Sequence, residues 1–265
     1  MPLPLPAEGE RWHLHGSPPC TAVSLANQVR DEDKRDHACD LVQWFLKFAM
    51  DSHCTSWSME QVAAPVILRA CEELKKPGSP YRHRFEYMAR DLSEIGVPQR
   101  RRRLIAGPPK LIAHFKRLPT KRLGIRDYIA EPRGTHVRGS SLWSCPRRAP
   151  TGIKGPQKKW IYKFYGDDDA CRPLNVPGPT ITATRGMNWA TPGTGTKLIE
   201  MSIQESAILQ TFPATYRFPA IRRRAIRGIG NALPPLVMRK LLSPVSLRPD
   251  SPSLRRPPGP IGPIG

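Results

Sequence analysis

The sequence predicts an α/β fold, a parallel sheet covered by helices, with a smaller irregular region inserted into it. Two observations lead to this prediction. Strand-like and helix-like patterns alternate over residues 12–107, as expected for parallel strands joined by helices. Residues 110–171 then show no helical period and hold 14 Lys and Arg against 5 Asp and Glu. With 265 residues, 39% of them hydrophobic, the chain is long enough to bury a core.

The first half of the alternating region contains two strands and a helix. Residues 12–15 predict a short strand, which runs into the turn sequence GSPPC. Alternation at Thr55, Trp57 and Met59 predicts a second strand. Between the two strands, apolar residues recur at the spacing of one helical face and predict a helix near 34–50: Ala38, Leu41, Val42, Phe45, Leu46 and Ala49.

The second half continues the alternation. The segment APVILRACEELKK predicts a helix that ends at a Pro-Gly turn. FEYMARD and RLIAG predict strands on either side of GVPQRRR.

The C-terminal third predicts a return to ordered structure around residues 180–182. Ser202 and Glu205 have the spacing of a capping box ahead of a helix. A last helix is predicted to start at Pro234–Pro235 and to run to about Leu242, because proline is favoured in a first helical turn. The proline-rich tail, residues 243–265, is predicted to be disordered.

Charge and composition narrow the classes of function. The net charge of +20 indicates a polyanionic partner, most simply nucleic acid. No apolar run approaches about 20 residues, and the N-terminus lacks the pattern of a secretory signal, so neither a membrane partner nor secretion is expected. The six cysteines form no CxxC pair and the histidines have no ligand spacing, so we expect no metal and reduced thiols in an intracellular protein.

Six segments occur in an order that chance does not readily produce. They are GSPPCTAVS at 16–24, MEQVAAP at 59–65, GVPQRRRRLIAG at 96–107, RPLNVPGPTITATRG at 172–186, ESAILQTFPATYRF at 205–218 and GIGNALPPLVMRKL at 228–241. In this order the chain resembles the cytosine-5 DNA methyltransferase family over about residues 12–242. The distances of 40 residues from Cys20 to Glu60 and 39 from Glu60 to Gln99 also fit that family.

The resemblance implies a Rossmann-like methyltransferase sheet and a division of the chain. Residues 1–109 would form the catalytic α/β region, 110–171 a basic, β-rich target-recognition region, 172–242 the return to the catalytic domain, and 243–265 the tail. The implied reaction transfers a methyl group from S-adenosylmethionine to carbon 5 of a cytosine flipped out of double-stranded DNA.

The family's reaction explains the types of residue in the matched motifs. Carbon 5 of cytosine becomes nucleophilic only after a thiolate adds to carbon 6, and Cys20 matches that thiolate. Glu60 matches the carboxyl that holds a proton at ring nitrogen 3. Arg101 and Arg103 match the arginines that hold the base and a neighbouring phosphate.

Further residues match binding roles of the family. Gln99, Arg100 and Ser24 are expected at the DNA, and Pro18, Asn231 and Ala232 at the methyl donor. For Cys20 the alternative is an ordinary buried thiol, and for Glu60 a solvated surface carboxylate.

The chain also departs from the family. Gln61, Thr21 and Val23 stand where the family usually has Asn, Gln and Phe. Only 19 residues precede Cys20, and they contain no Gly-rich cofactor turn, so we expect an N-terminally truncated sheet whose strand at 12–15 is an exposed edge.

Three explanations of this truncation stay open. The gene model has lost its 5′ end, a second polypeptide supplies the missing strands, or the chain is a non-catalytic DNA-binding remnant. The expected localisation is intracellular, and the nucleus in a eukaryote.

Overall fold

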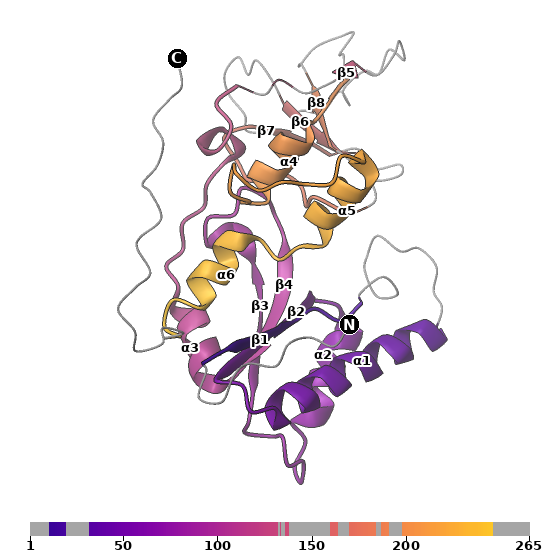
Figure 1. Cartoon of the computed structure of the whole chain (residues 1–265), viewed down its shortest axis with the longest axis vertical. Helices are drawn as coiled ribbons and strands as arrows, with labels where there is room; N and C mark the ends of the chain where they lie inside the picture. Colours follow the sequence, from indigo (N-terminus) through magenta and orange to yellow (C-terminus); the bar gives the residue numbers. More distant parts are fainter. Residues whose placement is uncertain are drawn as a thin grey trace.

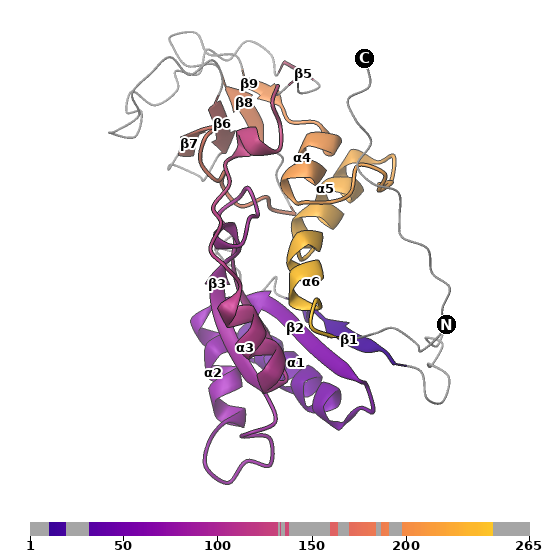
Figure 2. The same cartoon turned by 90° about the vertical axis from the view of Figure 1, so that its left-hand side faces the viewer.

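The structure is a computed structural model that describes residues 11–19, 32–131, 133, 136–137, 160–163, 170–183, 187–190 and 198–245. Two parts are visible in Figures 1 and 2. A four-stranded sheet with helices on both faces forms one part, and a small antiparallel sheet beside two helices forms the other. The predicted α/β fold is confirmed. The tail beyond residue 245, predicted to be disordered, lies outside the described residues.

The larger sheet is mixed rather than parallel, which corrects the prediction. Its strands are β1 (His13–Gly16), β2 (Ser56–Val62), β3 (Glu86–Asp91) and β4 (Arg102–Gly107), in the order β1-β2-β4-β3. β1 and β2 are parallel, whereas β4 is antiparallel to both of its neighbours. A parallel crossover needs about a dozen residues and usually a helix. Residues 92–101 contain only a single 3-10 turn, so β4 reverses direction beside β3.

Two predicted helices cover one face of this sheet. They are α1 (Glu32–Asp51) and α2 (Pro65–Leu74), and both are confirmed. All but one of the residues on the predicted apolar face of α1 are buried: Ala38, Val42, Phe45, Leu46 and Ala49, with Leu41 half-buried. They pack with Trp57 and Met59 of β2. At the end of β1, a Cβ on Gly16 would lie 2.1 Å from the Phe45 ring, so glycine is what allows α1 to approach this closely.

The opposite face is covered by α3 (Pro109–Arg117) and α6 (Pro235–Leu241). The proline-initiated α6 was predicted and is confirmed. The sequence did not predict α3, because its nine residues place only Leu111, Ile112 and Phe115 on the buried side among basic residues. So short a segment shows no clear period. It becomes a helix because these three side chains pack against Ile105 of the sheet.

The second sheet has the order β5-β9-β8-β6-β7, and its described pairs are antiparallel. Its strands are β5 (His136–Val137), β6 (Trp160–Lys163), β7 (Ala170–Pro173), β8 (Asn188–Ala190) and β9 (Leu198–Glu200). The expected β-rich insertion is therefore present. Because β8 and β9 pair within this sheet, it extends past the expected limit at residue 171.

Two helices pack beside this sheet, α4 (Ile203–Leu209) and α5 (Arg222–Asn231). The predicted capping box at α4 is confirmed. Ser202 Oγ accepts from the Glu205 amide at 3.0 Å, and Glu205 Oε2 accepts from the Ser202 amide at 2.8 Å. The sequence did not predict α5, because its four arginines and two glycines leave too few apolar residues for a helical spacing to be evident. No helix within the described ranges is both long and apolar enough to cross a bilayer.

Candidate active site

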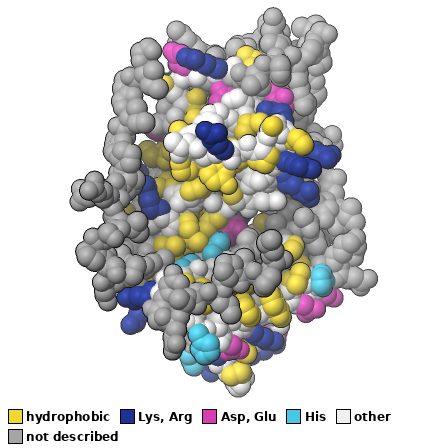
Figure 3. Space-filling view, viewed as in Figure 1, with side chains coloured by type: hydrophobic (Ala, Val, Ile, Leu, Met, Phe, Trp, Pro, Cys, Tyr) yellow, Lys and Arg dark blue, Asp and Glu magenta, His cyan; other side chains and the backbone are white. Residues whose placement is uncertain are grey.

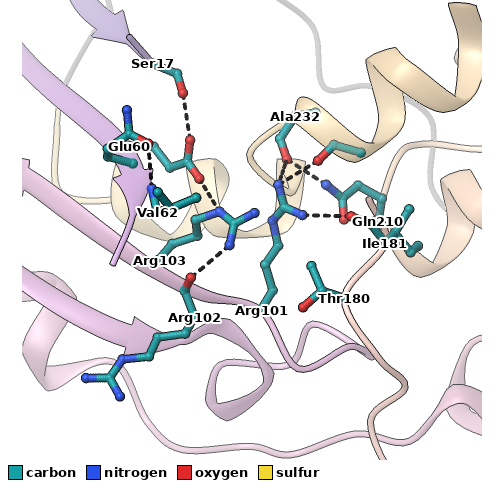
Figure 4. A network of polar contacts seen from close by, with 12 residues as sticks. Ser17, Glu60, Val62, Arg101, Arg102, Arg103, Thr180, Ile181, Gln210 and Ala232 are labelled. Carbon is teal, nitrogen blue, oxygen red and sulfur yellow. Dashed lines mark hydrogen bonds and ion pairs between the residues drawn. The ribbon is translucent and has the colours of Figure 1, made fainter. Parts of the chain in front are cut away.

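Glu60 is the centre of a buried polar cluster on β2, shown in Figure 4. Its side chain is only 4% exposed. Ser17 Oγ donates to one carboxylate oxygen at 2.7 Å, and Arg103 Nε pairs with the other at 2.7 Å. Arg103 lies on β4, diagonally across the β2–β4 ladder, and Ser17 follows β1. Three segments far apart in the sequence thus fix the orientation of one carboxylate.

Gln61 holds the loop that leads to Cys20. Its Nε2 donates to the Pro18 carbonyl at 2.9 Å, and its Oε1 accepts from the Val62 amide at 2.7 Å. Gln61 was singled out as a departure from the family's usual Asn. In this chain the longer side chain spans from β2 to the backbone of the loop. Cys20 itself and Ser24 lie outside the described residues.

Two described cysteines, Cys39 and Cys71, are poor nucleophiles. Burial, reinforced by the Glu72 carboxylate, raises the pKa of Cys71 to about 12. Burial also raises the pKa of the Cys39 thiol. Since the thiolate is the nucleophilic form, neither group is activated for addition to a base.

Arg101 does not join the Glu60 cluster. Its guanidinium is buried and donates to three backbone carbonyls: Ile181 at 3.1 Å, Gly230 at 2.9 Å and Ala232 at 3.1 Å. The side chain therefore ties the start of β4 to the segment before β8 and to the end of α5 (Figure 4). Its expected contact with the base stays a prediction.

Gln99 is fully buried and links the two parts of the molecule. Its Nε2 donates to the Leu209 carbonyl at 3.0 Å and to Gln210 Oε1, and its Oε1 accepts from the Ile181 amide at 2.9 Å. These contacts put Gln99 in the interior rather than on a surface that faces DNA. Gln210, also fully buried, donates to the Ile229 and Ala232 carbonyls. The sequence analysis gave Gln210 no role, and its only signal was its place in the Leu-Gln-Thr-Phe-Pro motif.

The remaining predicted residues lie around this framework. The Arg100 side chain is 59% exposed, with Nε 3.8 Å from Asp91 Oδ2, so its guanidinium remains accessible. Asn231 is exposed at the end of α5. The carbonyls of Pro18 and Ala232 already accept hydrogen bonds from Gln61, Arg101 and Gln210.

A pair of histidines that the sequence analysis left unassigned lies beside the cluster. His13 Nε2 and His15 Nδ1 are each 2.8 Å from the buried Ser58 hydroxyl. Burial and the neighbouring His15 lower the pKa of His13 to about 4. Burial also lowers the pKa of His15, against the opposing effect of Glu60. No group of three or more potential metal ligands is found in the described part of the chain.

The profile of one protein family, described as C-5 cytosine-specific DNA methylase, matches residues 124–246. Over this range, a little under half of its length, the chain is similar to that family. The resemblance drawn from the motifs is thereby confirmed. The match includes the segments that carry Ile181, Gln210 and Ala232, the partners of Gln99 and Arg101.

Individual known proteins are also similar to this chain. Over 47 residues the chain is 45% identical to the type II methyltransferase M.AgeI of Thalassovita gelatinovora, which is 18% of this chain and 11% of that protein. A crystal structure described as an E. coli prophage-encoded DNA modification methyltransferase superposes with a TM-score of 0.50 at 15% identity, covering 87% of this chain and 77% of the other. The EhMeth methyltransferase of Entamoeba histolytica gives 0.49 at 14% identity, covering 88% and 78%. The prophage-encoded structure supports the methylase-like fold.

Replacing Arg101 by leucine is expected to lower the free energy of unfolding by about 3 kcal/mol. Three buried carbonyls lose their donor, and each unsatisfied buried group costs about 1–3 kcal/mol, part of which the apolar leucine offsets. Urea denaturation followed by circular dichroism measures the change. Arg102→Leu, at an exposed position of β4, is the matched control and should change stability by less than about 0.5 kcal/mol. Equal losses in both variants would show that Arg101 does not connect the two parts.

His13 is expected to make the protein less stable as the pH falls from 6.5 to 4. Above pH 6.5 the ring is neutral in both states, whereas between 6.5 and about 4 only the unfolded chain binds the proton. We expect the free energy of unfolding to fall by about 2 kcal/mol over this pH range. This is less than the pKa shift of His13 alone would give, because the ring is partly exposed to solvent. Urea titrations at several pH values, compared with His13→Gln, measure it. If the wild-type chain and His13→Gln differed in free energy of unfolding by the same amount at every pH, the prediction would be contradicted.

Proposed function

We propose that this chain takes part in methylation of cytosine at carbon 5 in DNA, through a covalent adduct with Cys20. The observation that carries the proposal is the Glu60–Arg103–Ser17 cluster, in which Ser17 lies three residues before Cys20. The match of residues 124–246 to the C-5 cytosine-specific DNA methylase profile supports it independently. The two lines of support concern different segments of the chain, since the cluster lies outside the matched range.

The proposed reaction begins at carbon 6 of the flipped-out cytosine. The Cys20 thiolate adds to carbon 6 while ring nitrogen 3 takes up a proton, and the resulting enamine is nucleophilic at carbon 5. Carbon 5 would then bond to the donor's methyl group while the methyl–sulfur bond breaks and the sulfur leaves as a neutral thioether. Loss of the proton from carbon 5 to a base or water, departure of the thiolate and return of the nitrogen 3 proton to the Glu60 carboxylate restore the aromatic ring.

Glu60 and Arg103 are proposed to serve the first of these steps. A carboxyl fixed on both oxygens, by Ser17 and by Arg103, is oriented to hold the proton at nitrogen 3. Arg103 also donates to the Arg102 carbonyl, which fixes its own side chain. Gln61 holds the backbone at Pro18, two residues before the proposed nucleophile.

S-adenosylmethionine is the proposed methyl donor, and it supplies an electrophilic methyl group when bound. The described residues fit it only in part. The exposed Asn231 amide offers polar contacts, but the carbonyls of Pro18 and Ala232 are already occupied within the protein. We therefore assign no step of the reaction to contacts with the donor.

We also propose that a second polypeptide supplies a strand beside β1. Within the described sheet β1 is an end strand, and α1, which packs against it, exposes the stacked rings of Trp44 and Phe48. An exposed strand edge next to exposed aromatic rings suits a partner that adds a strand and a helix. The isolated chain should then show no thermal shift with S-adenosylmethionine. A clear shift would contradict this part of the proposal. The proposed place of action is intracellular, and the nucleus in a eukaryote.

A reaction that needs no methyl donor tests the catalytic proposal. In duplex DNA carrying tritium at carbon 5 of cytosine, enamine formation allows a solvent proton to add at carbon 5 and the tritium to leave into water. We expect the purified chain to release tritium from this DNA. DNA that binds without release would favour the alternative of a non-catalytic DNA-binding remnant and would overturn the proposed reaction for the isolated chain. Adding tritiated S-adenosylmethionine to unlabelled duplex then tests methyl transfer itself.

A further inference from the structure

A dense basic surface lies on α5 and the segment before it. Four arginine side chains are exposed there: Arg217, Arg223, Arg224 and Arg227. Figure 3 shows dark blue side chains gathered beside hydrophobic ones in the part of the molecule that contains α5. We refer to these four residues as the α5 basic surface.

The α5 basic surface is not neutralised by the rest of the described protein. Among the described residues, no carboxylate lies within ion-pair distance of any of its four guanidinium groups. Their neighbour Arg222 differs, because it pairs with Glu200 at 3.1 Å and donates to the Met201 carbonyl at 2.7 Å. Arg222 therefore has a structural partner, whereas the other four remain available.

Local stability does not explain these arginines. Basic residues in a first helical turn are disfavoured by the helix dipole, yet α5 begins with three arginines and has no acidic residue there. The buried side of α5 consists of Ala225, Ile226 and Ile229, and it does not depend on the arginines. The charge is better explained by an external anion.

Exposed apolar side chains adjoin the charge. Tyr216 is 51% exposed and Ile221 is 54% exposed. The Tyr216 ring packs on Phe212 and Phe218, with ring centroids 4.8 and 4.7 Å away, which holds it in place at the surface. Arginines next to a fixed aromatic ring are typical of surfaces that contact nucleic acid.

The position of α5 links this surface to the candidate site. The last turn of α5 supplies the Gly230 carbonyl that binds Arg101, and Arg101 precedes the strand that carries Arg103. A helix of 10 residues is about 15 Å long. At about 3.4 Å per phosphate along one strand, this length corresponds to about four nucleotides.

We propose that the α5 basic surface binds backbone phosphates of duplex DNA a few nucleotides from the target cytosine. The choice of DNA as the polyanion rests on the proposed function. Phosphate contacts of this kind set the position and orientation of the duplex and carry no sequence information themselves. The surface would add to the contacts expected from residues 110–171, apart from α3, which packs on the larger sheet rather than beside the small one.

The test compares two triple variants that remove the same charge. One is Arg223→Ala, Arg224→Ala, Arg227→Ala on α5. The other is Lys110→Ala, Lys116→Ala, Arg117→Ala on α3, which is equally exposed and lies in the other part of the molecule (Figures 1 and 2). Affinity for a fluorescent mixed-sequence duplex is measured by anisotropy over a range of salt concentrations. Thermal denaturation verifies that both variants are folded.

The plot of log affinity against log salt has a negative slope. The α5 variant should make this slope shallower by about two to three, roughly one for each phosphate contact removed. At physiological salt its affinity should fall at least about tenfold. The α3 variant should change the slope by less than about one, and the matched Arg→Lys triple variant on α5 should keep most of the affinity. Equal effects of the α5 and α3 variants would overturn the proposal, since only total charge would then matter.

The tritium release assay separates this inference from the proposed function. Release by the wild-type chain together with an unchanged salt slope in the α5 variant would refute only the α5 basic surface. A shallower salt slope in the α5 variant without any tritium release by the wild-type chain would refute the proposed reaction. It would still support DNA binding by the α5 basic surface.

Discussion

Replacing Cys20 by alanine is expected to abolish tritium release from carbon 5 of cytosine and, with it, methyl transfer. Without the thiolate no bond forms at carbon 6, and carbon 5 stays a poor nucleophile. A duplex containing 5-fluorocytosine offers a second measurement, because fluorine cannot leave carbon 5 as a proton does and the adduct is trapped. The wild-type chain, supplied with methyl donor and with the proposed second polypeptide, should form an adduct that survives denaturing electrophoresis, and the variant should form none under the same conditions.

Cys39→Ala is the matched control for this experiment. Cys39 is a half-buried thiol whose pKa burial raises, so its removal should leave release and adduct formation unchanged. An adduct that persists in the Cys20 variant would show that another cysteine is the nucleophile. A loss of DNA affinity in the Cys20 variant would indicate damage to the loop, so affinity is measured alongside.

Replacing Glu60 by glutamine is expected to lower the rate of tritium release by about 10²- to 10⁴-fold. The amide preserves the shape of the side chain and can still accept from Ser17, but it cannot exchange a proton with ring nitrogen 3. It also leaves the half-buried Arg103 without its carboxylate, which lowers stability. Rates are therefore measured well below the unfolding temperature of the variant, at saturating DNA.

Ser17→Ala separates proton transfer from positioning. This variant keeps the carboxyl and its ion pair with Arg103, and loses only the 2.7 Å hydrogen bond to Glu60. Its rate should fall by about tenfold, the equivalent of one hydrogen bond to a charged group. Equal losses in the two variants would indicate that Glu60 acts by its position alone and not by holding the proton.

Several elements of both parts of the molecule follow from local sequence patterns. The apolar spacing of α1, the proline at the start of α6 and the Ser202–Glu205 capping box each specify an element from a few neighbouring residues, and the structure contains all three. The order of the motifs likewise indicated the resemblance to the methylase family, and the profile match supports this resemblance over residues 124–246. These features depend on residue type and spacing along the chain, which the sequence states directly.

Other features were decided only by the tertiary structure. The direction of β4 depends on how ten residues pack between two strands, and α3 and α5 exist because short apolar faces find partners far away in sequence. The same holds within one motif. Gln99 and Arg101 match binding residues of the family, yet their side chains turn inward to the ends of α4 and α5, whereas Arg103 reaches Glu60. Sequence supplies the hydrogen-bonding groups of each side chain, but only the fold determines which carbonyl or carboxylate lies within reach.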